Sequence, residues 1–304
     1  MTGIFTKHSG SLEDVHTQVH WTLRVTAALC FIGHGTWGLI TKSGWLPFFA
    51  SQGIEPEFAW NLQPLIGAFD IAMAGLLLWK PRRIIVMWMM LWALWTAILR
   101  PLAGNLTKVQ LEDGSWEVIL NTASMNVPKM QTWEFWERAG NWGPPLMLLI
   151  LGGSFAMKWK DWLKVYQDKP STDSLDTVFF LCRFCLAALL IGHAGFGFAV
   201  GKQMLIDHWS AIGVDADLAF ITSVGYFELA LGVLVFSFPI RALVWVALVW
   251  KAFTEFLYVP ADTVKGMGFI NIFEWIERWG DYGIPVAMLY IINYRIAAKN
   301  ALNS

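Results

Sequence analysis

Long apolar stretches follow one another along the chain, and each is closed by proline, glycine or a cluster of charged residues. A helix that spans a bilayer needs about 20 mostly apolar residues. Eight stretches meet this requirement: 21–40, 61–79, 84–99, 139–157, 178–200, 219–238, 242–258 and 279–294. The pattern therefore predicts an all-α integral membrane protein with eight transmembrane helices.

The second half of the chain repeats the first half. Gly33-His34-Gly35 recurs as Gly192-His193-Ala194, at the same distance from a preceding arginine. The longest match is E-x-x-E-R-x-G-x-x-G-x-P, which starts at Glu134 and again at Glu274. Each repeat holds four predicted spans, an even number, so both repeats have the same orientation in the membrane. The predicted architecture is two parallel tandem four-helix bundles.

The distribution of charged residues predicts the boundaries and the orientation of these repeats. The larger share of Lys and Arg lies on the side that carries both termini, which predicts that both termini are cytoplasmic and that the protein sits in the inner (plasma) membrane. The predicted segments are an N-terminal tail (1–20), the first repeat (21–157), a cytoplasmic linker (158–177), the second repeat (178–294) and a C-terminal tail (295–304). The first repeat alone has a long outer loop, 101–132, and loops of that length are usually functional.

Composition agrees with a membrane protein and limits its partners. Of the 304 residues, 56% are hydrophobic and 15% are charged, whereas soluble domains carry about 25% charged residues. The net charge of −1 provides no electrostatic footprint for nucleic acid. Cys30, Cys182 and Cys185 all lie in apolar stretches, where cysteine packs as a small hydrophobic residue. We expect membrane lipids, other membrane subunits or a second copy of the chain as partners, and no nucleic acid.

Ionisable groups within the predicted spans are the first candidate site residues, because each costs about 2.5–3.5 kcal/mol on translocon scales. His34 and His193 lie at equal depth in the two repeats, and Asp70 and Glu228 lie in the spans that follow them. A buried carboxylate pairs with a nearby histidine or arginine or takes up a proton, so Asp70 and Glu228 are candidates for proton transfer, with a structural clamp as the alternative. Three interpretations of the histidines stay open. Each hydrogen-bonds the carboxylate of its own half, the two share one b-type haem, or they take part in proton transfer or quinone binding. The small residues that flank them suit either a flat ligand or close helix packing.

A second group of charges stands at the outer start of the fourth and eighth spans. Spacing places Glu134 and Arg138 on one helix face as an ion pair, and Glu274 and Arg278 likewise. Carboxylates near a histidine approximate an iron or manganese site, but the E-x-x-H motif of di-iron bundles is missing. No metal site is predicted.

The two repeats differ at one end of this group. The seventh span carries Lys251 and Glu255, one turn apart, where the third span has alanines, and a pair at that spacing can neutralise itself. Tyr258 stands where the first repeat has Arg100. An arginine can hold an anionic or carbonyl-bearing ligand with two hydrogen bonds. We therefore predict that the first repeat holds the principal small-molecule site, lined by His34, Asp70, Arg100, Glu134 and Glu137.

Short motifs in the first two predicted helices of each half carry a family resemblance. They are Phe31-Ile32-Gly33-His34-Gly35, then Gly67, Asp70 and Gly75, echoed by Gly225, Glu228 and Gly232, with the basic stop Pro81-Arg82-Arg83. Each half resembles the DoxX-like family of small four-helix membrane proteins. The resemblance implies a four-helix bundle and, in some members, a link to thiosulfate or quinone redox chemistry.

Three functions are consistent with these features. We expect a membrane protein associated with respiratory or sulfur/quinone redox chemistry that binds a quinone or b-type haem near the outer leaflet. The first alternative is an accessory subunit of a larger membrane complex, without catalysis of its own. The second is a pathway for protons or small solutes through the buried carboxylates.

Overall fold

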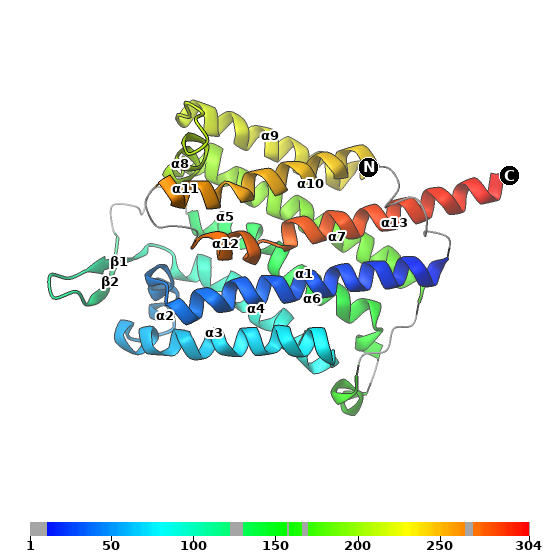
Figure 1. Ribbon diagram of the computed structural model, residues 1–304, viewed down its shortest axis with the longest axis horizontal. Coiled ribbons are helices and arrows are strands. Elements are labelled where there is room, and N and C mark those ends of the chain that lie inside the picture. The colour runs from blue at the N-terminus through cyan, green and yellow to red at the C-terminus, as the bar shows by residue number, and fades with distance from the viewer. Residues whose placement is uncertain (1–10, 122–129, 157, 166–169, 265–269, 304) are drawn as a thin grey trace.

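The computed structural model describes residues 11–121, 130–156, 158–165, 170–264 and 270–303, which are mostly helical (Figure 1). The first half contains α1 (Leu12–Ile40), η1 (Ser43–Trp45), α2 (Leu46–Ala50), α3 (Pro56–Trp79), α4 (Arg83–Ala103), β1 (Leu106–Gln110), β2 (Trp116–Leu120), α5 (Met130–Glu137), α6 (Ala139–Leu151), η3 (Ser154–Ala156) and η4 (Trp159–Leu163). The second half contains α7 (Thr172–Gly195), η5 (Phe196–Val200), α8 (Gln203–Ser210), α9 (Leu218–Ser237), α10 (Arg241–Phe256), α11 (Tyr258–Val264), α12 (Ile272–Glu277) and α13 (Gly280–Asn303).

Six described helical segments are long and apolar enough to cross a membrane, which agrees with the predicted class of protein. They are Leu12–Ile40, Pro56–Trp79, Arg83–Ala103, Thr172–Val200, Leu218–Ser237 and Arg241–Ala261. The fourth and eighth predicted spans, which correspond to α6 and α13, are not among them. Each of these is preceded by a break at an arginine, Arg138 with φ −73° and ψ 5° and Arg278 with φ −87° and ψ 20°. The predicted eight spans are therefore not confirmed.

The first helix is longer than the apolar pattern predicted. It starts at Leu12, within the segment predicted as a tail, because Ser11 caps it by accepting a hydrogen bond from the Asp14 N–H at 3.1 Å. Val15, Val19 and Leu23, spaced by four residues, are fully buried along one face. Polar residues lie between them, so a search for uninterrupted apolar stretches does not detect this amphipathic part of the helix.

The two halves pack into each other. Within each half, the first helix lies against the next long one, α1 on α3 and α7 on α9. The short helix before each arginine break also packs on the other half, α12 on α1 and α5 on α7. One hydrophobic cluster includes buried residues from both halves. The structure is therefore a single interlocked body, and two separate tandem bundles are not confirmed.

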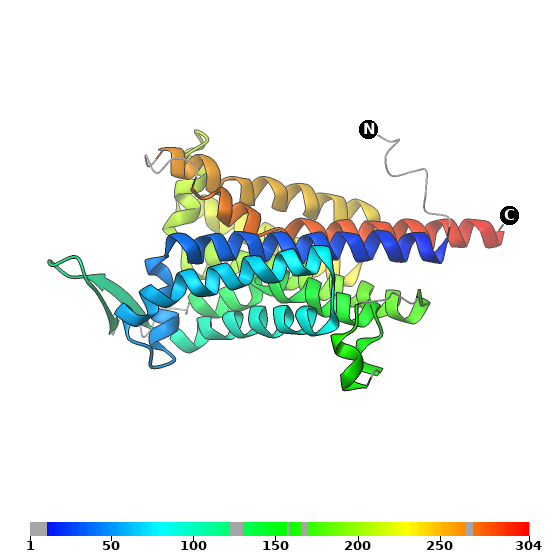
Figure 2. The same cartoon turned by 60° about the horizontal axis from the view of Figure 1, so that its bottom comes forward.

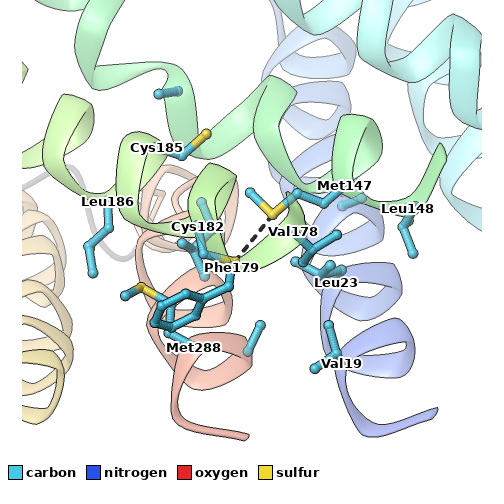
Figure 3. Packing of buried hydrophobic residues seen from close by; sticks show 14 of the residues in the cluster. Val19, Leu23, Met147, Leu148, Val178, Phe179, Cys182, Cys185, Leu186 and Met288 are labelled. Atoms are coloured by element: carbon cyan, nitrogen blue, oxygen red, sulfur yellow. Dashed lines mark hydrogen bonds between the residues drawn. The ribbon is translucent and has the colours of Figure 1, made fainter. Parts of the chain in front are cut away.

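The centre of this body is an apolar core that includes the cysteines. Figure 3 shows Cys182 on α7 facing Met147, and their sulfur atoms are 3.3 Å apart. Leu23 of α1 and Met288 of α13 pack nearby in the same view. All three cysteines are buried and free, as expected for residues that pack as small hydrophobes.

The long helices run side by side, so the molecule has two distinct ends (Figures 1 and 2). The start of α1 and the end of α13 lie at one end, and α2, α8 and the β1–β2 hairpin lie at the other. The hairpin pairs antiparallel from Leu106↔Leu120 to Gln110↔Trp116. It occupies part of the predicted loop 101–132, of which residues 122–129 lie outside the described residues. The hairpin itself was not predicted.

Candidate functional site

Each candidate histidine pairs with the carboxylate of its own half. His34 Nδ1 is 2.8 Å from Asp70 Oδ2, and His193 Nδ1 is 2.7 Å from Glu228 Oε2. Asp70 and Glu228 are 0% and 1% exposed. The geometry of both histidines is that of the predicted pair within each half.

Neighbouring backbone fills the space beside the small residues that flank these histidines. A Cβ on Gly33 would lie 2.3 Å from Glu277 N, and one on Gly192 would lie 2.3 Å from Glu137 N. These glycines therefore allow α12 and α5 to approach α1 and α7 closely. They do not leave room for a flat ligand, so close packing is the correct reading of this feature.

Charged pairs join the two halves reciprocally where α5 and α12 end. Arg138 bonds Glu277, and Arg278 bonds Glu137. The described ion pair of Arg138 is with Glu277 across the junction, while the predicted partner Glu134 lies one helical turn before Arg138 and 3.8 Å from Arg100. Arg278 does approach Glu274, at 4.0 Å, but it also lies against Glu137. Glu137 is thus committed to the junction between the halves.

The second half extends this charged network to its histidine. Lys251 bonds Glu255, as the spacing predicted, and its Nζ lies 3.3 Å from Asp281 Oδ2. Arg278 Nε is 3.0 Å from Glu255 Oε2, and His193 Nε2 is 3.8 Å from Glu255 Oε1. Both ring nitrogens of His193 therefore face carboxylates.

Arg100 lies at the end of α4 and is only 5% exposed. Its Nη1 donates to Thr96 O at 3.0 Å, and its Nε lies 3.8 Å from Glu134 Oε2. Its guanidinium carbon is 4.7 Å from the centre of the Phe48 ring. Arg100 is thus held inside the protein and does not extend toward the lipid, as arginines at the ends of spans commonly do.

A cavity of about 280 Å³ lies between α1, α2, α3 and α4, with His34 and Arg100 on its wall. The remaining wall is mostly aromatic and aliphatic: Trp45, Phe48, Phe49, Gln52, Ile54, Leu62, Ile66, Trp92, Trp95, Thr96 and Leu99. The His34 ring stacks on Trp45, with centroids 4.5 Å apart and an angle of 19°. The cavity is close to the lower end of ligand pockets, which hold roughly 300–1,000 Å³.

The carboxylate of the second half makes one hydrogen bond more than its counterpart in the first half. Trp250 Nε1 donates to Glu228 Oε1 at 2.8 Å, so Glu228 binds both an indole and an imidazole. At the matching positions of the first half, Trp92 Nε1 and Asp70 Oδ1 are buried and have no hydrogen-bond partner among the described residues. The His34 side chain is 16% exposed and that of His193 is 7% exposed.

The structure brings together part of the predicted site. His34 and Arg100 both line the cavity. Asp70 contacts His34, and Glu134 lies near Arg100. Glu137 is turned toward the second half, and His193 does not line this cavity. Sequence reasoning missed Trp45 and Trp92 as wall residues. The repeat of Trp92 as Trp250 was the signal that could have found the second of them.

Two further observations describe the electrostatics around the site. In the described ranges, no three His, Cys, Asp or Glu side chains are grouped as ligands for a metal ion. Lys42, just after α1, bonds Glu274, and burial lowers the pKa of its ammonium to about 7 despite neighbouring carboxylates. The rim of the charged network therefore includes an amine whose pKa is lowered by burial.

No protein-family model, curated protein or solved structure matches this chain. The functional argument therefore depends on the geometry described above.

Proposed function

We propose that the protein binds a quinone-class ligand in the cavity beside His34 and Arg100. The observation that carries this proposal is one cavity that combines an aromatic wall with an imidazole and a buried guanidinium. Ligand pockets are typically apolar with a few polar groups that fix orientation. A quinone ring suits the aromatic wall, and its carbonyl oxygens suit hydrogen-bond donors.

The residues of the cavity fit such a ligand in charge as well as in shape. Arg100 Nε is a buried donor with no hydrogen-bond partner among the described residues. The nearest carboxylate, Glu134, is 3.8 Å away, and so a carbonyl oxygen would supply a hydrogen bond that the protein does not. A quinone supplies reversible uptake of two electrons and two protons. His34 and Asp70, 2.8 Å apart, are placed to hold or release a proton at that end of the cavity.

The membrane setting of this proposal follows the charge distribution of the sequence. We propose that α6 and α13 also cross the bilayer, each as the second part of a broken helix, which gives eight crossings in two parallel repeats. Both termini would then be cytoplasmic, in the inner (plasma) membrane. The cavity would lie near the outer leaflet. We further propose that each half is a member of the DoxX-like family.

Binding of a short-chain benzoquinone to the purified full-length chain in detergent tests the proposed function. Quenching of tryptophan fluorescence reports the affinity, and extraction of the purified protein reports any quinone that it retains. His34→Ala and Arg100→Ala should each weaken binding about tenfold, the value of one hydrogen bond to a charged or polar group. His193→Ala and Tyr258→Leu are the matched changes in the second half and should leave the affinity unchanged.

Two results would contradict the proposal. The first is a wild-type chain that neither retains nor binds quinone. The second is an equal loss of affinity in both halves, which would favour a site shared by His34 and His193. A visible absorption spectrum of the same sample tests whether such a shared site holds a b-type haem, because haem would give a Soret band.

One observation favours a second candidate function, a proton pathway. The ion pairs from Lys42 and Glu274 through Arg278 and Glu255 form a chain of charged groups from the rim to the buried Lys251. Proton flux into liposomes that contain the protein tests this candidate. Flux that Glu255→Gln abolishes would support it, and flux equal to that of empty liposomes would refute it.

A further inference from the structure

The two repeats differ in a hydrogen bond between a carboxylate and a tryptophan, which is present in the second repeat and missing in the first. Asp70 and Trp92 are separated by the same number of residues as Glu228 and Trp250. In the second half, Glu228 reaches the indole N–H of Trp250 at 2.8 Å. Asp70 is one methylene shorter, and in the first half this bond is missing.

Both ends of the missing bond are buried polar atoms. Trp92 Nε1 and Asp70 Oδ1 each have less than 1 Å² of exposed surface and no partner among the described residues. A buried donor that makes no hydrogen bond destabilises the folded protein. Such an atom calls for an explanation, and a ligand that bonds it is one.

Trp92 belongs to the wall of the cavity described above. It lines the 280 Å³ cavity together with His34 and Thr96. The same three residues also line a small adjoining void of about 10 Å³, with Cys30, Phe31, Ala93 and Asn141. A space of that size admits about one oxygen atom. In the second half, Lys251 stands where the first half has Ala93, so a long side chain occupies the matching position.

The Trp92 ring is also held in a defined orientation. It stacks on Trp88 with ring centroids 5.9 Å apart and an angle of 10° between planes. Trp88 in turn meets Phe69 edge to face, with centroids 5.5 Å apart. An indole fixed on one side by stacking can present its N–H without a large loss of entropy on binding.

We propose that Trp92 donates a hydrogen bond to a carbonyl oxygen of the ligand, and that the short side chain of Asp70 keeps this donor free. Trp92 is then a ligand-binding residue, and Asp70 is a positioning residue that acts through His34 and by its length. The ligand carries at least two acceptor oxygens, one for Trp92 and one for Arg100. This inference rests on the proposed quinone-class ligand and adds the groups that recognise its carbonyls.

A double-mutant cycle in the full-length chain tests the inference. Trp92→Phe removes the donor and should weaken binding of a short-chain benzoquinone about tenfold. Asp70→Glu should weaken it by a similar factor, because the longer carboxylate captures the indole as Glu228 does. The two changes together should then weaken binding no more than Trp92→Phe alone, since the donor can be lost only once.

Two controls separate this mechanism from general damage. Trp250→Phe makes the same change in the second half, where the indole already bonds Glu228, and should leave the affinity at the wild-type value. An alkylbenzene of the same shape, which has no carbonyl oxygen, should bind the wild type and Trp92→Phe equally. The NMR signal of the Trp92 indole N–H can be assigned by its loss in Trp92→Phe. Its chemical shift should change in Asp70→Glu in the absence of ligand.

The outcomes distinguish a failure of this inference from a failure of the proposed function. If the wild type binds no benzoquinone, the proposed function fails. If the wild type binds it and Trp92→Phe binds it equally well, only the inference is overturned. Additive losses in the double variant would also overturn it, because Asp70 would then act independently of Trp92. If Asp70→Glu does not fold, Trp92→Phe against Trp250→Phe still decides the role of the donor.

Discussion

Replacement of Lys251 by methionine should destabilise the protein strongly. Lys251 and Glu255 are both 0% exposed, and Lys251 Nζ contacts Glu255 and Asp281. Methionine keeps much of the length of the side chain but removes the ammonium. Two buried carboxylates then lose their shared cation, while Glu255 keeps Arg278 at 3.0 Å.

The size of the effect follows from the separation of the charges. At the 3.3 Å between Lys251 Nζ and Asp281 Oδ2, two unit charges attract by about 5 kcal/mol at an effective dielectric constant of about 20. The dehydration of Lys251 offsets part of this attraction in the native protein. Removing one partner of a buried pair generally costs about 3–5 kcal/mol, because the other charge stays buried. We expect a loss in this range for Lys251→Met.

Unfolding in detergent micelles by a denaturant titration, followed by tryptophan fluorescence, measures this loss. The matched control is Lys251→Met with Asp281→Asn, which removes one charge of each sign and installs the amide that Asn141 provides in the first half. This double variant should recover at least half of the lost free energy. A single variant within about 1 kcal/mol of wild type, or a double variant as unstable as the single, would refute the reasoning.

Three further predictions concern groups outside the cavity. Because burial lowers the pKa of Lys42 to about 7, its amine should react with an acylating reagent with a midpoint near pH 7, as followed by mass spectrometry of the labelled peptide. Burial also lowers the pKa of His208 to about 4, so the unfolded chain binds a proton more readily below pH 6.5. The free energy of unfolding should therefore fall by up to about 3 kcal/mol between pH 6.5 and 4, and His208→Asn should lose this dependence. A Cβ on Gly280 would lie 2.0 Å from Gly140 O, so Gly280→Ala should lower the thermal midpoint sharply. Gly75→Ala is its control, since a Cβ there meets nothing within 4 Å, and an equal effect of both would show that close approach is not the cause.

The sequence predicts those features that depend on one helix or on the repeat. Apolar stretches identify the long helices, and the spacing of Lys251 and Glu255 predicts their pair. The repeat predicts that His34 and His193 have equivalent environments, and each does bind a carboxylate of its own half. Local spacing and symmetry carry enough information for these contacts.

Helical spacing and the internal repeat could not predict the contacts between the halves. A helical spacing rule compares Arg138 with residues on its own helix, and so it cannot find Glu277, which is 139 residues away. The hairpin had a local signal, since Asp113-Gly114 lies between two alternating segments and Gly114 has φ +84°. The search for membrane spans passed over that signal. Asp70 and Glu228 differ by one methylene. A search by residue class treats the two as equal, so it could not indicate that the Trp92 indole lacks the bond that Trp250 makes.

The reciprocal pairs between the halves have a consequence for the biogenesis of the protein. Glu137 and Arg138 leave the ribosome about 140 residues before Arg278 and Glu277, which they bind in the folded chain. At translation rates of about 5–20 residues per second, this delay is roughly 7–28 s. During that time the newly made first half carries an acid and a base whose partners do not yet exist. Helix α5 can pack on α7 only after α7 has been synthesised. The two halves therefore complete their folding together although they are translated one after the other.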